Sequence, residues 1–243
     1  TMDKEKTKVI WNDAGLPVVP YVLMTRTILN DSKKYDEVFK KAINELGLPL
    51  FVKPCNAGSS VGASKASTEK EFSMALMEAF MWDDKVLIEK SINAREVECS
   101  VTGIATLEDE ANPCSICRAY LPGEILPTHT FYDFDAKYND PDGAKLQIPA
   151  NLSEDEIKNI QQTAIEAYRA VDASGLSRVD FFIDRDDGKI YLNEINTLPG
   201  FTSISMFPKM CEASGLKYAD LIELLLNEAV VKHECKMKLS TSR

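Results

Sequence analysis

The alternation of apolar and polar residues along the chain predicts a mixture of helices and strands. Helical periodicity is expected over residues 3–15, Asp31–Glu45, Thr68–Trp82, Ser153–Ala173 and Tyr218–Lys232. Short apolar runs predict strands over residues 49–54, 85–91 and 96–105. Hairpins recur in this pattern, whereas strict βαβ alternation does not. We therefore predict an α+β fold in two lobes that divide near Asn93–Ala94.

Residues at the ends of the helical stretches support their assignment. The first helix is expected to end at Gly15, with Pro17 beyond it, and Gly47 closes the second. Thr68–Glu71 has the sequence of a capping box, and Ser153–Glu156 has an equivalent cap.

Two segments lack a clear period. Residues 121–150 carry several prolines and aromatic residues, and an unstructured loop of that length is often functional. The polar tail after His233 is expected to fray.

Residues 178–196 predict a β-hairpin, because an Asp-Gly turn signal separates two β-rich runs. If the turn centres on Asp187, Asp180 pairs with Glu194, and Arg178 pairs with Asn196. Side chains alternate between faces with period two, so these four groups meet in one patch. Opposed carboxylates repel, and Mg²⁺ resolves that repulsion through carboxylate and amide oxygens. The alternative is a solvated polar face of the hairpin without a metal.

A second segment with candidate chemistry is 51-FVKPCNAGSSVG-62. It matches neither a Walker A loop nor a dinucleotide fingerprint. Lys53 ends a strand and is followed by small residues, whose backbone N–H groups can cradle phosphates. A flexible turn between two strands is the alternative interpretation.

Composition excludes several classes of function. The 243 residues are 44% hydrophobic and 27% charged, enough for one large domain or two compact ones. A net charge of −10 argues against binding to nucleic acid or to an anionic membrane. No signal-like segment is evident, and no apolar run approaches the roughly 18 residues of a membrane span.

The six cysteines are dispersed through a chain that can build a core, so reduced thiols are expected. Cys114 and Cys117 form a CxxC motif. Structural zinc would need a second such pair or two histidines near it, and the chain has only His129 and His233. We therefore expect no zinc site.

Several motifs recur in one order: Lys53-Pro, Gly58-Ser-Ser-Val-Gly62, Glu89-Lys90, Arg178-Val-Asp180 and Glu194-Ile-Asn196-Thr-Leu-Pro-Gly200. With 2-MDK-4 and 136-AKY-138, they make the chain resemble the D-alanine–D-alanine ligases of the ATP-grasp superfamily, from about Met2 to Val231. The resemblance implies an ATP-grasp fold with ATP between two α+β lobes, a central lobe at 1–94 and a C-terminal lobe at 95–243. It also implies that ATP phosphorylates one D-alanine, whose acyl phosphate is attacked by the amine of a second.

The resemblance also implies roles for individual residues. The ATP-binding residues would be Lys4, Lys53, Ser60, Glu89, Lys90, Glu96 and Lys137. The ligands of two Mg²⁺ or Mn²⁺ ions would be Asp180, Glu194 and Asn196. The catalytic residues would be Arg178, Gly200, Ser59, Tyr138 and Lys137, and the substrate residues Gly200, Ser205 and Met206. For Glu89 and Lys90, an ion pair at a strand end is the alternative.

Within this family, D-lactate and D-serine ligases often carry arginine where this chain has Met206, and they alter the loop at Tyr138. The resemblance therefore favours D-alanine as the acceptor, with D-serine, D-lactate or another ATP-grasp substrate as alternatives. A nucleotide-binding module without catalysis is the alternative of another class. The complete set of predicted catalytic and metal-binding residues argues against this alternative. A module that only binds a nucleotide has no need of an arginine, such as Arg178, that stabilises an oxyanion.

The family has a further N-terminal lobe, whose glutamate binds the first D-alanine and meets the positions of Ser59 and Tyr138. That lobe is absent from this sequence, so we expect weak ATP–Mg²⁺ binding and poor ligase activity from the chain as given. Exposed apolar surface would favour a homodimer. The resemblance implies a role in peptidoglycan precursor synthesis in a bacterial cytoplasm.

Overall fold

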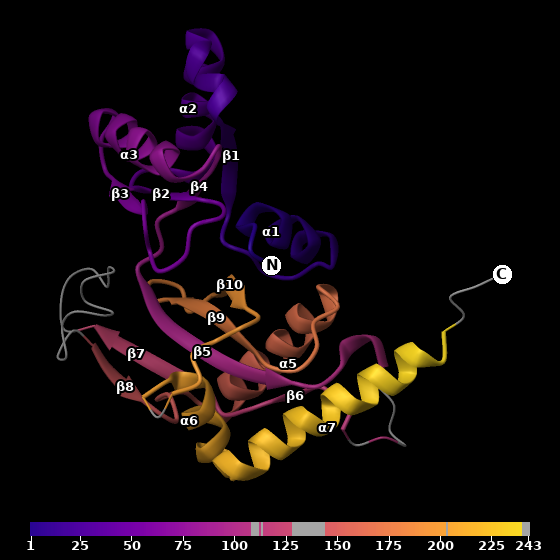
Figure 1. The fold of residues 1–243 in the computed structure, drawn as a ribbon. Coiled ribbons are helices and arrows are strands. Elements are labelled where there is room, and N and C mark those ends of the chain that lie inside the picture. The colour runs from indigo at the N-terminus through magenta and orange to yellow at the C-terminus, as the bar shows by residue number, and fades with distance from the viewer. Residues whose placement is uncertain (108–111, 113, 128–143, 203, 240–243) are drawn as a thin grey trace.

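The computed structural model describes residues 1–107, 112, 114–127, 144–202 and 204–239. Its described elements form two α+β lobes, shown one above the other in Figure 1. The sheet of the first lobe has the strand order β1-β4-β2-β3. Its strands are β1 (Tyr21–Thr25), β2 (Leu50–Pro54), β3 (Ser64–Ala66) and β4 (Lys85–Lys90). Its helices are α2 (Ser32–Leu46) and α3 (Glu69–Trp82), and a 3₁₀ turn, η1 (Arg26–Asn30), follows β1.

The sheet of the second lobe is antiparallel, with the order β10-β9-β5-β7-β8 and with β6 paired to β5. Its strands are β5 (Ala94–Thr102), β6 (Arg118–Ala119), β7 (Gly123–Pro127), β8 (Ala144–Gln147), β9 (Ser177–Asp184) and β10 (Ile190–Asn196). A second 3₁₀ turn, η2, spans Ala105–Leu107. The helices are α5 (Glu154–Ala170), α6 (Met206–Ala213) and α7 (Tyr218–Met237). These elements agree with the predicted α+β class.

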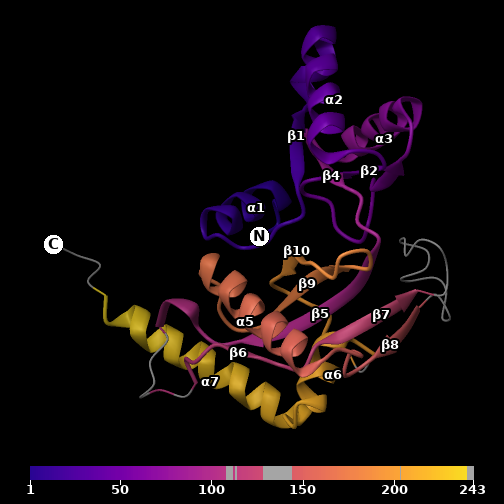
Figure 2. The ribbon, with the colours of Figure 1, turned by 180° about the vertical axis from the view of Figure 1, so that it is seen from behind.

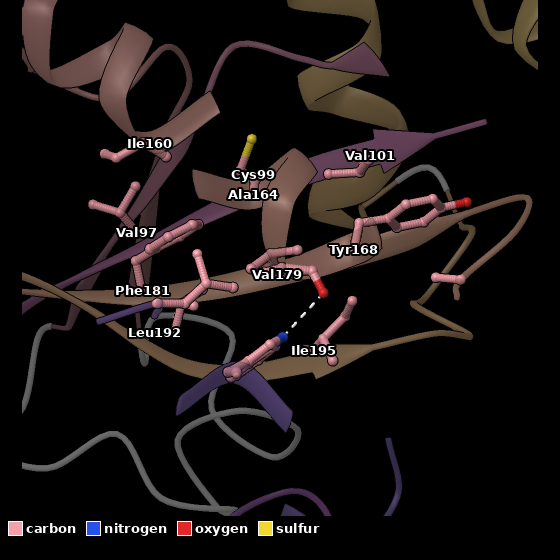
Figure 3. Packing of buried hydrophobic residues seen from close by; sticks show 14 of the residues in the cluster. Val97, Cys99, Val101, Ile160, Ala164, Tyr168, Val179, Phe181, Leu192 and Ile195 are labelled. Atoms are coloured by element: carbon pink, nitrogen blue, oxygen red, sulfur yellow. Dashed lines mark hydrogen bonds between the residues drawn. The ribbon is translucent and has the colours of Figure 1, made fainter. Parts of the chain in front are cut away.

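The faces of the second sheet are set by period-two alternation along its central strands. Odd-numbered residues of β5 and β9 pack with α5 in a hydrophobic cluster, which Figure 3 shows for Val97, Val179 and Phe181. Even-numbered residues face the other way: Ser100 donates a hydrogen bond to the Phe207 carbonyl at 3.1 Å. Arg178 and Asp180 therefore lie on the face opposite α5.

The first helix, α1 (Lys4–Asp13), does not follow the division expected at residue 94. Trp11 and Leu16 belong to the hydrophobic cluster of the second sheet. Trp11 Nε1 donates a hydrogen bond to the Ala167 carbonyl of α5 at 2.9 Å. Figures 1 and 2 show α1 beside the junction of the lobes, above α5. Through Trp11 and Leu16 this segment thus packs against the second lobe, although it precedes the strands of the first lobe in the sequence.

The expected helix ends are present. The first helix closes at Gly15, whose φ is +73°, and Leu16 N donates to the Trp11 carbonyl at 2.9 Å. Ser153 and Glu156 form a complete capping box. At Thr68 only half of the box exists, because the Glu71 carboxylate accepts from Ser67 N instead of the N-cap N–H.

Other expectations were wrong. Residues 121–150 are not one irregular loop, since β7 and β8 pair within them; residues 128–143 lie outside the described part. The last helix continues to Met237, so residues 234–237, expected to belong to a frayed tail, are helical. The strands β1 and β3 and the helix α6 were not predicted. Among the described helices, none has the length and apolar character needed to cross a bilayer.

Candidate active site

A cleft of about 670 Å³ lies between the two lobes. Eight of the predicted site residues line it: Lys4, Lys53, Ser59, Ser60, Glu89, Lys90, Glu96 and Glu194. Sequence reasoning missed the apolar walls of the cleft, Phe51 from β2 and Phe182 from β9, together with the connection Ser91–Asn93 between the lobes. The cleft thus combines apolar walls with convergent charged groups, which suits a small molecule that has an apolar part and a charged part.

The loop 56–62 closes one side of the cleft in two tight turns. Val61 N donates to the Gly58 carbonyl at 3.1 Å, and Ala63 N donates to the Ser60 carbonyl at 3.2 Å. Ser59 and Ser60 both have positive φ values, 54° and 60°, a conformation that costs a non-glycine residue about 1 kcal/mol or more. The surrounding structure holds this strained backbone in place, as is common at ligand-binding loops.

Gly62 shows why this loop requires glycine. Its φ is +68°, and a Cβ atom there would lie 2.5 Å from Trp82 Cδ1. Any other residue would clash with the indole ring of α3 and would also be strained. The glycine therefore lets the loop pack closely on α3.

Lys4 connects this loop to the hairpin of β9 and β10. Its Nζ donates to the Ala57 carbonyl at 2.6 Å and lies 3.6 Å from Glu194 Oε2. Its backbone N–H donates to the Cys55 carbonyl at 3.0 Å. The start of α1 thus places an ammonium group between the phosphate-type loop and a predicted metal ligand.

Glu89 lies in a buried ion cluster, so its side chain is occupied by the ion pair that was the alternative interpretation. Glu89 Oε2 is 2.8 Å from Lys53 Nζ, and Oε1 is 2.9 Å from Lys8 Nζ. Burial alone would raise the pKa of Glu89, but the ammonium groups of Lys53 and Lys8 outweigh it and lower that pKa. Lys53 Nζ also donates to Asn193 Oδ1 at 3.1 Å, across the cleft. Lys8 and Asn193 carried no recognisable motif in the sequence.

The hairpin pairs the four polar groups as predicted: Asp180 lies opposite Glu194, and Arg178 lies opposite Asn196. This pairing does not arise, however, from the regular register around Asp187 that the sequence predicted. Near the turn Ile183 pairs with Ile190, a register that would put Asp180 opposite Asn193. A β-bulge between Leu192 and Glu194 corrects this register by one residue.

Arg178 binds Asp180 within the same strand. Nε and Nη2 of Arg178 donate to the two carboxylate oxygens of Asp180, each at 2.7 Å. Glu98 Oε2 from β5 lies 3.2 Å from Arg178 Nε and was not predicted. Burial alone would lower the pKa of Arg178, but the carboxylates of Asp180 and Glu98 outweigh burial and raise it. The guanidinium therefore stays charged on this face.

The donor set of the hairpin suits a hard divalent cation. Asp180 and Glu194 supply carboxylate oxygens, and Asn196 supplies an amide oxygen that also accepts from Leu198 N at 3.1 Å. A carboxylate has about four lone-pair sites, so the arginine bonds of Asp180 leave acceptor capacity. The described residues contain no group of three or more His, Cys, Asp or Glu side chains placed for a metal. A cation here would therefore need further oxygens from phosphate or water.

The predicted substrate residues lie at the start of α6. A Cβ atom on Gly200 would lie 2.8 Å from Ser205 Oγ, which accepts from Thr202 N at 3.1 Å. Met206 is 7% exposed and packs with Ile125 and Met210. The side chain of Met206 thus serves the hydrophobic core and leaves the backbone at this helix end for a ligand. Lys137 and Tyr138 lie outside the described residues.

Comparisons with known proteins agree on one family. Residues 10–227 match the family model described as D-ala D-ala ligase C-terminus. The chain is 54% identical over 243 residues to a D-alanine–D-alanine ligase of Treponema denticola, covering all of this chain and 63% of that protein. The chain therefore spans a little under two thirds of the length of this relative.

Solved structures give the same result. The D-alanine–D-alanine ligase from Coxiella burnetii superposes with a TM-score of 0.78 at 37% identity, covering 98% of this chain and 59% of that one. The VanG D-Ala:D-Ser ligase from Enterococcus faecalis gives a TM-score of 0.78 at 34% identity, covering 93% of this chain and 61% of that one. These neighbours confirm the ATP-grasp fold expected from the sequence.

Proposed function

Because the chain belongs to the family described as D-ala D-ala ligase C-terminus, we propose that it carries the nucleotide site and catalytic hairpin of an ATP-dependent ligase joining two D-alanines. One observation carries this proposal. The cleft places the lysines of the first lobe opposite the acids of the second, with Lys53 bonded to Asn193 across it. Lysines suit nucleotide phosphates, and the acids suit the metal that accompanies them.

In this proposal the first lobe binds the nucleotide. Lys4, Lys53 and the loop around Ser60 hold the phosphates, the last as backbone N–H donors. Lys90 and the backbone of the connection after it border the base, between the apolar walls of the cleft. Glu96 accepts hydrogen bonds from the ribose.

The second lobe performs the chemistry. Asp180, Glu194 and Asn196 would hold Mg²⁺ or Mn²⁺, which neutralises charge on the phosphates as it moves to the leaving group. Arg178 stabilises the oxyanion that forms when the second amine attacks, and the Gly200 N–H is its other donor. The guanidinium is suited to this task because its two carboxylate neighbours keep it charged and fixed.

D-serine as the acceptor is a second candidate, since one structural neighbour is a D-Ala:D-Ser ligase. The side chain of Met206 packs in the core, so the acceptor is bordered there by backbone and by Ser205. Release of phosphate from ATP with D-alanine, D-serine or D-lactate as acceptor separates these candidates. Phosphate release that D-alanine does not stimulate, but another acceptor does, would reject the dipeptide assignment.

The first test of the proposal is titration of ATP with and without Mg²⁺, on the unaltered chain and on Glu194→Gln. We expect Mg²⁺ to strengthen ATP binding about tenfold in the unaltered chain, because the hairpin face is built for a cation. In Glu194→Gln the Mg²⁺ effect should fall below about twofold, because one anionic oxygen donor is lost.

The control is Glu45→Gln, the same chemical change at an exposed position of α2. Its Mg²⁺ response should match that of the unaltered chain. If Mg²⁺ strengthened ATP binding equally in Glu194→Gln and in the unaltered chain, the metal would not bind at the hairpin. If Mg²⁺ had no effect on ATP binding in the unaltered chain, the proposed site would be rejected.

A further inference from the structure

Lys8 is a buried lysine that no motif predicted. Its side chain has 0% exposure, and its Nζ lies 2.9 Å from Glu89 Oε1 and 5.7 Å from the centre of the Tyr21 ring. Within the described residues, Lys8 is not among those that line the cleft. Lys8 would therefore not touch a molecule bound in the cleft, and its charge would act on that molecule from a distance, partly by offsetting the charge of Glu89.

The cluster carries an excess of positive charge. Glu89 is one carboxylate between two ammonium groups, those of Lys8 and Lys53. Burial lowers the pKa of Lys8, and the carboxylate of Glu89 acts in the opposite direction. With both ammonium groups protonated, two cations and one anion leave a net charge of +1, and Lys53 is the cation that lines the cleft. Without Lys8, the carboxylate 2.8 Å away would neutralise Lys53, and the cluster would present no net charge to the cleft.

The geometry also fixes where the charge is presented. An ammonium group has three N–H donors, and those of Lys53 reach Glu89 Oε2 and Asn193 Oδ1. Among the described residues the third donor has no partner, so it can bind a group in the cleft. Burying an ammonium group costs free energy that an apolar side chain would not. Space filling alone therefore does not explain a lysine at this position, because an apolar side chain would fill the same space at a lower cost in free energy.

We propose that Lys8 is a positioning residue for nucleotide binding: it neutralises Glu89, so that the full charge of Lys53 remains available to the phosphate groups. This inference rests on the proposed function, because it deepens the role of the same cleft. Its distinctive consequence is that the effect of Lys8 scales with the charge of the ligand.

The test compares ATP, ADP and adenosine in the absence of Mg²⁺, so that no metal bound at the hairpin contributes to the affinities. NMR titration measures the dissociation constants, including millimolar ones. In Lys8→Met we expect ATP binding to weaken about tenfold, ADP binding less, and adenosine binding to stay within about twofold. A merely structural role would weaken all three ligands alike, and that result would overturn the inference.

Two further variants complete the design. Lys158→Met makes the same change at an exposed position of α5 and should leave all three affinities unchanged. Lys8→Met with Glu89→Gln restores a net charge of +1 and should restore ATP binding to within about threefold. This double variant also serves if Lys8→Met does not fold, because it leaves no unpaired buried charge at either position. If the double variant instead bound ATP, ADP and adenosine all more weakly, and by the same factor, the inference would be overturned.

The outcomes for the two proposals are distinct. An unaltered chain that does not bind ATP in the Mg²⁺-dependent titration would reject the proposed function, and this inference with it. ATP binding that Lys8→Met leaves unchanged would reject the role of Lys8 alone.

Discussion

Glu89 and Glu228 are two equally buried glutamates with opposite electrostatic states. Glu89 is 1% exposed in the first lobe, and Glu228 is 2% exposed on α7 in the second. Burial raises the pKa of Glu228 to about 7, whereas the two lysines lower the pKa of Glu89. Burial alone therefore does not determine the charge of an acid in this protein.

The difference lies in their neighbours. Within the described residues, the carboxylate oxygens of Glu228 have no hydrogen-bond partner. Among the described residues, the Gly103 backbone and the Arg118 guanidinium favour the charged form of Glu228, but burial outweighs them and raises its pKa. The phenols of Tyr168 and Tyr120 lie close enough for Glu228 to raise their pKa values. Glu89 has an ammonium group within 3 Å of each oxygen. Glu89, which lines the cleft, is held charged, whereas Glu228, on α7, is held neutral at mildly acidic pH.

The largest expected effect tests the charged member of this pair. Glu89→Gln leaves Lys8 fully buried without its counter-ion, so we expect the free energy of unfolding at pH 7 to fall by about 3 kcal/mol. Urea unfolding measures this change, with Glu45→Gln as the exposed control. A loss below about 0.5 kcal/mol would mean that the two buried glutamates do not differ in the way described.

The second prediction tests the neutral member. A folded pKa of about 7 against an unfolded value of 4.5 means that the folded state binds more protons between these values. The contribution of Glu228 is therefore fully present below pH 4.5 and is lost as the pH rises through 7. Glu228→Gln should match the unaltered chain at pH 4 and exceed its stability by about 2 kcal/mol at pH 8.5. Parallel stability curves for the two proteins would contradict this assignment.

The third prediction, with the smallest expected effect, concerns the cation near Glu228, which is Arg118. Arg118→Met should raise the pKa of Glu228 further and lower stability at pH 8 by about 0.5 kcal/mol, because Arg118 is exposed and its charge is screened. In the Glu228→Gln background the same substitution should have no such effect, as a double-mutant cycle would measure. A loss that persists in that background would assign Arg118 a different role.

The hairpin illustrates how far the sequence could predict the site. Period-two alternation and one turn signal were enough to pair Asp180 with Glu194 and Arg178 with Asn196. The bulge that produces this register was not predicted. One signal was present: Leu192 and Ile195 are three residues apart, yet both pack in the same hydrophobic cluster, which regular alternation forbids.

Long-range contacts account for the rest. The helix α1 contains three lysines and one threonine, and its sequence does not distinguish Lys8 from the others. Only the fold shows that Lys8 is buried against Glu89 of β4. Glu98 reads as an ordinary strand residue until β5 pairs with β9 and brings it to Arg178. The pairing of β7 with β8 joins strands separated by a long connection, and local pattern does not specify such partners.

The position of α1 has a mechanical consequence. Its hydrophobic face is anchored in the second lobe, whereas its charged residues bind the first: Lys85 meets Asp3 and Glu5, and Glu89 meets Lys8. Lys85 and Glu89 are both on β4. A rotation of one lobe against the other that preserves these ion pairs must pivot on the line where α1 meets β4. We predict that such a rotation would separate the Gly/Ser loop from the hairpin turn more than it would move the residues where α1 meets β4.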